Sequence, residues 1–168
     1  MDIDQFVLGM KDALKKTPQL TEEEIKTMVE QYRAAAMAER AKEFSSVGKT
    51  NMDEGKAFLA ENKAKEGIQS TASGLQYEIL TATEGAKPSA TDTVSVHYHG
   101  TLIDGLVFDS SVERGNPATF GVNQVIPGWT EALQLMNVGS KYRLYIPENL
   151  AYGANPHPGG PIQPFSTL

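Results

Sequence analysis

The sequence of 168 residues contains no cysteine. This absence excludes disulfide bonds, catalysis by a thiolate and metal binding by thiolates, but it leaves the cellular compartment open. No apolar run approaches the roughly 18 residues that a membrane-spanning helix requires. Acidic residues also outnumber basic ones, with 21 aspartates and glutamates against 15 lysines and arginines. The net charge of −6 argues against a nucleic-acid-binding protein, because phosphate contacts require a basic face.

Some catalytic patterns are missing as well. We find no arrangement typical of a serine–histidine–acid triad, no paired carboxylates and no glycine-rich phosphate loop. The hydrophobic content of 40% and the charged content of 21% are ordinary, so the chain is expected to fold as a soluble globular protein. Its length allows one domain with an appendage, or two small domains.

The first 20 residues carry a helical pattern. Asp2 is a suitable N-cap and Pro18 ends the pattern. Apolar residues recur at spacings of three and four and form one stripe: Ile3, Phe6, Val7, Met10 and Leu14. We therefore predict a short amphipathic helical segment within residues 1–20.

A second helical pattern covers residues 21–66. Thr21 and Glu24 form a capping box, and no proline follows until well beyond Lys65. Only Gly48 and Gly55 weaken the run, by about 1 kcal/mol each relative to alanine. A helix of about 40 residues would rise on the order of 60 Å. We expect one long exposed helix, and a break within residues 45–50 is the alternative.

The pattern changes to short alternating runs bounded by glycine, proline, serine and aspartate after about residue 70. One short helix is predicted over residues 128–136, with Trp129, Leu133 and Met136 on one face. Strands are predicted over residues 74–81, 92–102, 106–109, 117–122 and 141–147. Helices followed by mostly antiparallel strands indicate an α+β fold.

The predicted strand at residues 92–102 has two different faces. Val94, Val96 and Tyr98 point to one side, and Ser95, His97 and His99 point to the other. Two histidines on one face could bind a metal. However, no third or fourth ligand is nearby and cysteine is absent, so we interpret His97 and His99 as solvent-facing polar side chains and predict no metal.

The second half of the chain also concentrates aromatic and aliphatic residues near turns and loops. Such a composition, with few polar anchors, is typical of a concave site for a small ligand. The residues that suggest this site are Tyr98, Phe108, Asp109, Val125, Ile126, Trp129, Tyr152 and His157. Four of them have an alternative interpretation: Trp129 and Tyr152 as core residues, Asp109 as a turn cap, and His157 as an ordinary loop residue.

Three long motifs in this half resemble the FKBP family of peptidyl-prolyl isomerases, which bind the macrolides tacrolimus and rapamycin. The motifs are VHYHGTLIDGLVFDSS from residue 96, VIPGWTEALQLMNVGSKYRLYIPENLAYGA from residue 125, and HPGG from residue 157. The resemblance covers residues 74–168. The helical first half resembles the subgroup typified by the macrophage infectivity potentiator, in which a dimerising segment is joined to the catalytic domain by a long exposed helix.

The resemblance implies roles for individual residues. Trp129 would form the floor for the proline ring, with Tyr152 and the Ile126 N–H as donors to substrate carbonyls. Asp109 would face the carbonyl of the imide, between walls formed by Tyr98 and Phe108. The implied catalytic residues are Tyr98, Asp109 and Tyr152, and the implied substrate-binding residues are Phe108, Phe120, Val125, Ile126, Trp129 and His157. No cofactor is implied.

The resemblance also implies a domain organisation. Residues 1–20 would be part of a dimerisation segment, residues 21–66 the linking helix, and residues 72–168 the isomerase domain, with an antiparallel sheet wrapped around one short helix. Family members continue beyond the position of Leu168 with an interior strand, so the sheet is expected here without that strand.

The implied function is acceleration of X–Pro bond rotation in folding or unfolded polypeptides, together with chaperone activity. Proline-containing clients, macrolides and a second copy of the chain are the implied partners. The alternative is a holdase chaperone or protein-binding module without significant catalysis, and a metallochaperone is a weaker one. The resemblance favours the bacterial periplasm or cell envelope, with the cytoplasm as the alternative.

Overall fold

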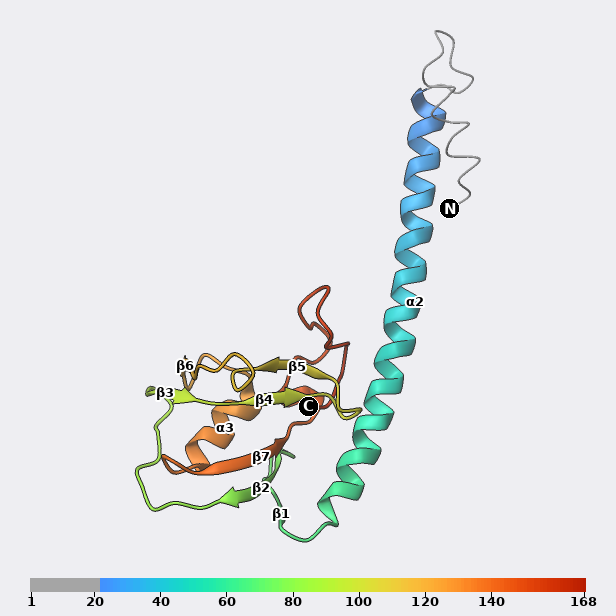
Figure 1. The fold of residues 1–168 in the computed structure, drawn as a ribbon. Coiled ribbons are helices and arrows are strands. Elements are labelled where there is room, and N and C mark those ends of the chain that lie inside the picture. The colour runs from blue at the N-terminus through green and yellow to red at the C-terminus, as the bar shows by residue number, and fades with distance from the viewer. Residues whose placement is uncertain (1–21) are drawn as a thin grey trace. The chain divides into compact units, whose positions relative to one another are not determined.

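A computed structural model of the chain describes residues 22–168, so the helical segment predicted within residues 1–20 and the cap at Thr21 lie outside the described residues. The chain divides into two units, residues 1–43 and residues 44–168. Figure 1 draws the described residues as a ribbon. The described part confirms the predicted α+β class, with one long helix followed by short antiparallel strands and a short helix.

Helix α2 (Glu22–Lys63) is continuous through residues 45–50, where the sequence allowed a break. Within unit 1 its apolar side chains are exposed, and the accessible fractions of Ile25, Met28, Val29 and Tyr32 are 46%, 57%, 43% and 59%. None of the helices in residues 22–168 combines the length and the apolarity needed to cross a bilayer.

The second half of α2 belongs to the unit of residues 44–168 and packs into it. Asn62 is fully buried, and its side-chain amide donates to Gln76 Oε1 at 3.0 Å. The amide of Gln76 donates in turn to the carbonyl of Leu59 at 2.8 Å. Gly48 and Gly55, which the sequence suggests only weaken the helix, are buried where α2 meets the C-terminal segment of the chain.

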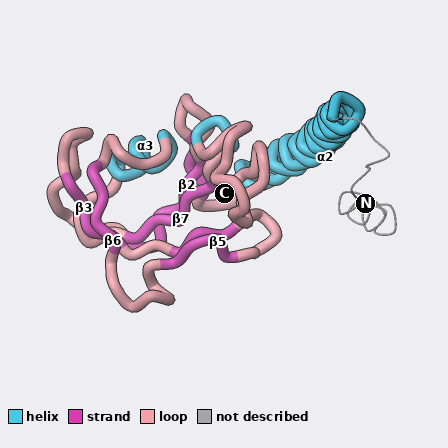
Figure 2. Tube along the Cα trace, turned by 90° about the horizontal axis from the view of Figure 1, so that it is seen from above, coloured by secondary structure: helices cyan, strands magenta, loops and turns pink. Residues whose placement is uncertain are grey.

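Within residues 22–168, the strands pair in three separate antiparallel ladders rather than in one sheet. Figure 2 shows the strands of these ladders in magenta. The first ladder has the order β1-β2-β7, the second joins β3 to β6, and the third joins β4 to β5. The bounds are β1 (Ile68–Ser70), β2 (Gln76–Thr81), β3 (Thr93–Val96), β4 (His99–Thr101), β5 (Val107–Ser110), β6 (Ala118–Gly121) and β7 (Lys141–Tyr145).

The strand predicted over residues 92–102 is interrupted at His97 and Tyr98, so it forms β3 and β4. At the interruption a serine supplies the partners for the backbone of Tyr98. The Tyr98 N–H donates to Ser111 Oγ at 2.8 Å, and the Ser111 N–H donates to the Tyr98 carbonyl at 3.0 Å. Hydrophobic alternation continues through this point, which is why the sequence indicated one strand.

Helix α3 (Pro127–Leu135) packs against β7 and supplies the centre of the core (Figure 1). Its Ala132 is buried with Leu75 and Ile146. Proline at the first helical position suits the start of a helix, because its fixed φ angle is helical and no N–H is lost from the ladder. A short 3₁₀ helix, η1 (Glu148–Leu150), follows β7.

Gly128 sets how closely α3 approaches the strand. A β-carbon added there would lie 2.6 Å from Ile146 Cγ2 and 3.2 Å from the Leu150 carbonyl oxygen. The absence of a side chain therefore allows the first turn of α3 to lie directly on the end of β7. That approach fixes the position of the next residue, Trp129.

We predict that Gly55→Ala destabilises the fold by about 1–3 kcal/mol through overpacking, although alanine favours helix. An added β-carbon would overlap Oγ1 of Thr167 and lie 3.2 Å from its Cβ, and Thr167 is only 3% exposed. Urea unfolding followed by tryptophan fluorescence measures the change. Ser45→Ala, at an exposed position of the same helix, is the control and should stay within about 0.5 kcal/mol of the parent. An increase in the stability of Gly55→Ala would contradict the packing described here.

Candidate active site

The unit of residues 44–168 contains one large concavity of about 2000 Å³ that runs along β3, β4 and β7 and past the first turn of α3. It is larger than the roughly 300–1,000 Å³ of an ordinary ligand pocket, so the aromatic part beside α3 is one region of a longer groove. Eight of the predicted site residues line this concavity: Tyr98, Phe108, Asp109, Phe120, Val125, Ile126, Trp129 and Tyr152. His157 is not among the lining residues.

Three aromatic rings meet in the part of the concavity beside α3: Tyr98 from the break between β3 and β4, Phe120 from β6 and Trp129 from α3. The Trp129 ring meets the Tyr98 ring at a centroid distance of 5.2 Å and an angle of 82°, and it meets the Phe120 ring at 5.8 Å and 89°. These are edge-to-face contacts, in which the positive edge of one ring meets the negative face of another. They hold the indole of Trp129 in a fixed orientation.

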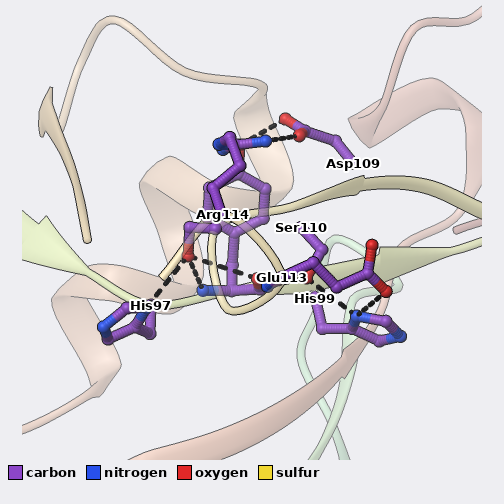
Figure 3. A network of polar contacts seen from close by, with 8 residues as sticks. His97, His99, Asp109, Ser110, Glu113 and Arg114 are labelled. Carbon is purple, nitrogen blue, oxygen red and sulfur yellow. Dashed lines mark hydrogen bonds and ion pairs between the residues drawn. The ribbon is translucent and has the colours of Figure 1, made fainter. Parts of the chain in front are cut away.

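The polar group of this region is a triplet formed by Tyr98, Asp109 and Arg114. The Tyr98 hydroxyl donates to Asp109 Oδ2, and the Arg114 guanidinium donates to Asp109 Oδ1. A second guanidinium nitrogen of Arg114 donates to the Tyr98 hydroxyl oxygen at 2.9 Å, and its central carbon lies 5.6 Å from the centre of the Tyr98 ring. Figure 3 shows the guanidinium facing the Asp109 carboxylate. Both oxygens of Asp109 are therefore hydrogen-bonded.

Arg114 is not among the site residues that the sequence predicts. Arginine lies five residues after Asp109, in the turn that follows β5, and nothing in the spacing of the chain indicates that it turns back to the carboxylate. Only a chemical argument could have indicated Arg114. An aspartate placed beside an apolar pocket needs a cationic or hydrogen-bonding partner, and Arg114 is the lysine or arginine nearest to Asp109 in the sequence.

The triplet separates the ionisation states of its members. Hydrogen bonds from Tyr98 first, and from Arg114 second, hold the pKa of Asp109 below its ordinary value of 3.8. Burial first, and the hydrogen bond to Asp109 second, raise the pKa of Tyr98 above its ordinary value of 10.0. Near neutral pH the site therefore combines an ionised carboxylate with a protonated phenol.

Two neighbouring residues orient the walls of the pocket. Ser111 is fully buried and satisfies both backbone groups of Tyr98 at the break between β3 and β4. Gly100 faces the Phe108 ring, and an added β-carbon would lie 2.5 Å from Phe108 Cζ. Tyr98 and Phe108 can therefore take their positions only because position 111 provides a small hydroxyl and position 100 lacks a side chain.

His97 lies in the break between β3 and β4 and His99 lies in β4. Both are exposed, and both also line the concavity. His97 Nδ1 lies 3.3 Å from Ser111 Oγ, and His99 Nδ1 lies 3.0 Å from Ser110 Oγ and 3.9 Å from Glu113 (Figure 3). Within residues 22–168, no three histidine, aspartate or glutamate side chains are grouped closely enough to hold a metal ion. The histidines contact serines of the segment that also carries Asp109.

Tyr152 and His157 lie in the loop that follows η1. Tyr152 is 42% exposed at the concavity, and its hydroxyl forms no hydrogen bond with any residue of the described part of the chain. That hydroxyl is therefore available to a ligand. The N–H of Gly153 donates to the carbonyl of Glu148 at 3.0 Å and fixes the turn that carries Tyr152.

Comparison with known families identifies both halves of the sequence. Residues 84–168 match the sequence profile described as FKBP-type peptidyl-prolyl cis-trans isomerase. Residues 1–79 match a profile described as the domain amino terminal to FKBP-type peptidyl-prolyl isomerase. All nine predicted site residues lie within residues 84–168, the region that matches the first profile.

Two similar proteins can be aligned with the whole length of this chain. The outer membrane protein MIP of Legionella longbeachae is 50% identical over 171 residues, which are 100% of this chain and 73% of that protein. The FKBP-type peptidyl-prolyl cis-trans isomerase FkpA of Aeromonas hydrophila is 48% identical over 168 residues, and this chain spans 62% of its length.

Among solved structures, FkpA from Escherichia coli matches with a TM-score of 0.81 at 36% identity, covering 99% of this chain and 78% of that one. Its similarity includes the long helix as well as the sheet region, since nearly the whole chain is aligned. The chain therefore belongs to the FKBP-type peptidyl-prolyl cis-trans isomerases, a family of enzymes, as its motifs indicated.

Proposed function

We propose that the aromatic end of the concavity binds the proline of an X–Pro segment and accelerates rotation about the imide bond without forming a covalent bond. The observation that supports this most directly is that the Tyr98–Asp109–Arg114 triplet lies beside Trp129, whose ring makes an edge-to-face contact with the Tyr98 ring. No nucleophile is required. The proline ring would rest on Trp129, and Tyr98 and Phe108 would form the walls.

The chemistry of the imide bond explains how such a pocket catalyses rotation. Rotation breaks amide resonance against a barrier of about 18–20 kcal/mol. The twisted imide has lost much of the charge separation of the planar form, so an apolar surface disfavours the planar ground state more than the twisted state. Hydrogen-bond donors placed around the twisted geometry stabilise it further.

Specific polar groups have distinct proposed roles. The free hydroxyl of Tyr152 and the N–H of Ile126 would donate to substrate carbonyls and fix the peptide. The ionised carboxylate of Asp109 would face the carbonyl of the rotating imide, where charge changes during rotation. Val125 and Phe120 would complete the apolar lining, and His157 would contact the substrate from the loop.

The partners follow from the same site and from the helical first half. We propose that proline-containing polypeptides are the clients, that macrolides such as tacrolimus and rapamycin occupy the same pocket, and that residues 1–20 hold a homodimer. Residues 21–66 would link that segment to an isomerase domain of residues 72–168. Two domains on helical arms would bind one client with a higher effective concentration.

A second candidate function is a holdase activity. The exposed apolar side chains of α2 in residues 25–44 favour it, because scattered apolar surface on a solvated helix can contact unfolded chains. This activity would not depend on the triplet, so variants of the pocket separate the two functions.

We expect Tyr98→Phe to lower kcat/KM for a short proline peptide by about 10-fold, because the substitution removes a hydrogen bond to an ionised group while keeping the ring. A protease-coupled isomerisation assay measures the rate. Tyr77→Phe is the matched control: its hydroxyl donates to Gln69 at 2.8 Å on the β1-β2 ladder, outside the concavity, and the variant should keep the parent rate.

The same assay distinguishes the candidate functions. If the parent chain suppresses client aggregation but does not accelerate isomerisation, the holdase replaces the isomerase as the function of this chain. If Tyr98→Phe isomerises the peptide at the parent rate, as the Tyr77→Phe control should, the proposed role of the triplet is contradicted. Catalysis by the apolar surface of Trp129 would not be.

The ionisation of the triplet gives a pH prediction. Because the pKa of Asp109 is lowered in the fold, its carboxylate contributes stability that is fully present above its ordinary value of 3.8, and this contribution is lost as the pH falls through the folded value. Arg114→Leu removes one of the two main causes, so the pKa of Asp109 should rise towards 3.8. Carboxyl ¹³C NMR between pH 2 and 6 follows the titration of this residue.

Arg143→Leu is the control for that titration. Arg143 forms an exposed ion pair with Glu78 at 3.2 Å on the β2-β7 ladder, so its removal should leave the pKa of Asp109 unchanged. A titration of Asp109 that is the same in the parent and in Arg114→Leu would show that the arginine does not influence the carboxylate.

The proposed dimer is tested by comparing the full chain with residues 21–168. We expect sedimentation velocity to give a dimer for the full chain and a monomer for the shorter chain, because the amphipathic stripe of residues 3–14 would supply the apolar interface. Tryptophan fluorescence checks that the isomerase domain remains folded. If the shorter chain also sediments as a dimer, the interface lies elsewhere, for example on the exposed stripe that contains Met28 and Tyr32.

A further inference from the structure

One face of the second half of α2 is made of small and amide side chains. Gly48, Asn51, Gly55 and Asn62 follow spacings of three, four and seven, which place them on one side of a helix. Gly48, Gly55 and Asn62 are buried, whereas neighbours such as Lys49 and Asp53 are exposed. This face, defined by Gly48, Asn51 and Gly55 and called the support face below, contacts another part of the same unit.

The support face contacts three residues of the segment 164–167: Pro164, Phe165 and Thr167. The Asn51 amide donates to the carbonyl of Pro164 at 2.8 Å. A β-carbon added to Gly48 would lie 2.8 Å from Cδ2 of the Phe165 ring, and one added to Gly55 would meet Thr167. The fit leaves no space for larger side chains, so the helix and residues 164–167 lie in direct contact.

Residues 164–167 close the base of the loop that carries Tyr152 and His157. The Phe165 N–H donates to the carbonyl of Gly153 at 2.8 Å, one residue from Tyr152. Leu168 and Ile146 exchange two backbone hydrogen bonds, at 2.7 Å and 3.0 Å, and anchor the far end of the segment to the end of β7. A displacement of Phe165 would therefore move the turn of Tyr152.

Phe165 holds this position in a strained conformation. Its φ angle of +57° is the only positive φ of a non-glycine residue in the described part of the chain. A bulky side chain rarely adopts this region, and such a residue persists only when its surroundings hold it in place. The ring of Phe165 lies over Gly48, and its preceding carbonyl is held by Asn51. The support face provides that restraint.

We infer that the support face of α2 positions the loop of residues 152–165 for substrate binding, with Asn51 as a positioning residue that acts through Pro164 and Phe165 on Tyr152. The inference rests on the proposed function of the concavity. It gives α2 a part in the site as well as a linking role. The long helix and the substrate-binding loop are then coupled through one hydrogen bond and two glycine contacts.

The test uses Asn51→Asp in the full chain, because this substitution keeps the shape of the side chain and replaces the donor by an acceptor facing a carbonyl. We expect KM for a proline peptide, and Kd for tacrolimus measured by quenching of Trp129 fluorescence, to rise about 3- to 10-fold with kcat within about 2-fold of the parent. Gly48→Ala, which presses on the Phe165 ring from the same face, should act in the same direction.

A purely structural role gives a different result. Partial unfolding would lower the concentration of active protein, so the apparent kcat would fall while KM and Kd stayed the same. Gln31→Glu adds the same charge at an exposed position of α2 in the other unit and should leave all three constants unchanged. Unchanged KM and Kd in both Asn51→Asp and Gly48→Ala would overturn the inference.

Amide hydrogen exchange makes the test independent of activity. In Asn51→Asp, the amides of Gly153 and Phe165 should exchange faster, while the amides of β2 and β7 keep their protection. Unchanged protection in the loop would overturn the positioning role whatever the enzyme does. A parent chain that neither isomerises the peptide nor binds tacrolimus would instead refute the proposed function, and the exchange experiment would still decide whether Asn51 supports the loop.

Discussion

The site depends on the hydrogen bond between Tyr98 and Asp109, which joins the break between β3 and β4 to strand β5. Tyr98 can reach Asp109 because the strand is interrupted at that residue and Ser111 satisfies its backbone. The same bond holds the Tyr98 ring in its edge-to-face contact with the Trp129 ring. Arg114 then neutralises the carboxylate that the bond brings to the apolar surface. Removing any of these groups would leave a charged or polar group at that surface without its partner.

An isomerase without a nucleophile must place all of its catalytic groups before the substrate arrives, because only fixed dipoles and surfaces discriminate the twisted imide from the planar one. The fold supplies this preorganisation from several elements. Gly128 allows α3 to lie on the end of β7, which fixes Trp129, and Gly100 makes room for the ring of Phe108. The positions of small residues therefore decide the shape of the pocket as much as the aromatic residues that line it.

The sequence predicted the features that are local or carried by long motifs: the α+β class, helix α3, the long helix, and the eight residues that line the concavity. It did not indicate Arg114 or Ser111, because their partners are reached through a turn and across a strand break rather than by a regular spacing. The alternation of residues 94–99 also concealed that break. Gly48 and Gly55 were interpreted from helix propensity alone, and their contacts with Phe165 and Thr167 are more than 100 residues away in the sequence.

Gly48 and Gly55 explain why the second half of α2 packs differently from its first half. Residues 25–37 of α2 carry apolar side chains in solvent, whereas the face of Gly48, Asn51 and Gly55 has almost no side chain to contribute to a core. A helix that packs through large apolar residues gains stability from burial, but it also keeps its partner at the distance that those residues set. Small residues bring the backbone of α2 close enough for an amide to reach the carbonyl of Pro164. The close approach costs helix propensity at two positions, and in return it restrains the one strained residue at the base of the Tyr152 loop.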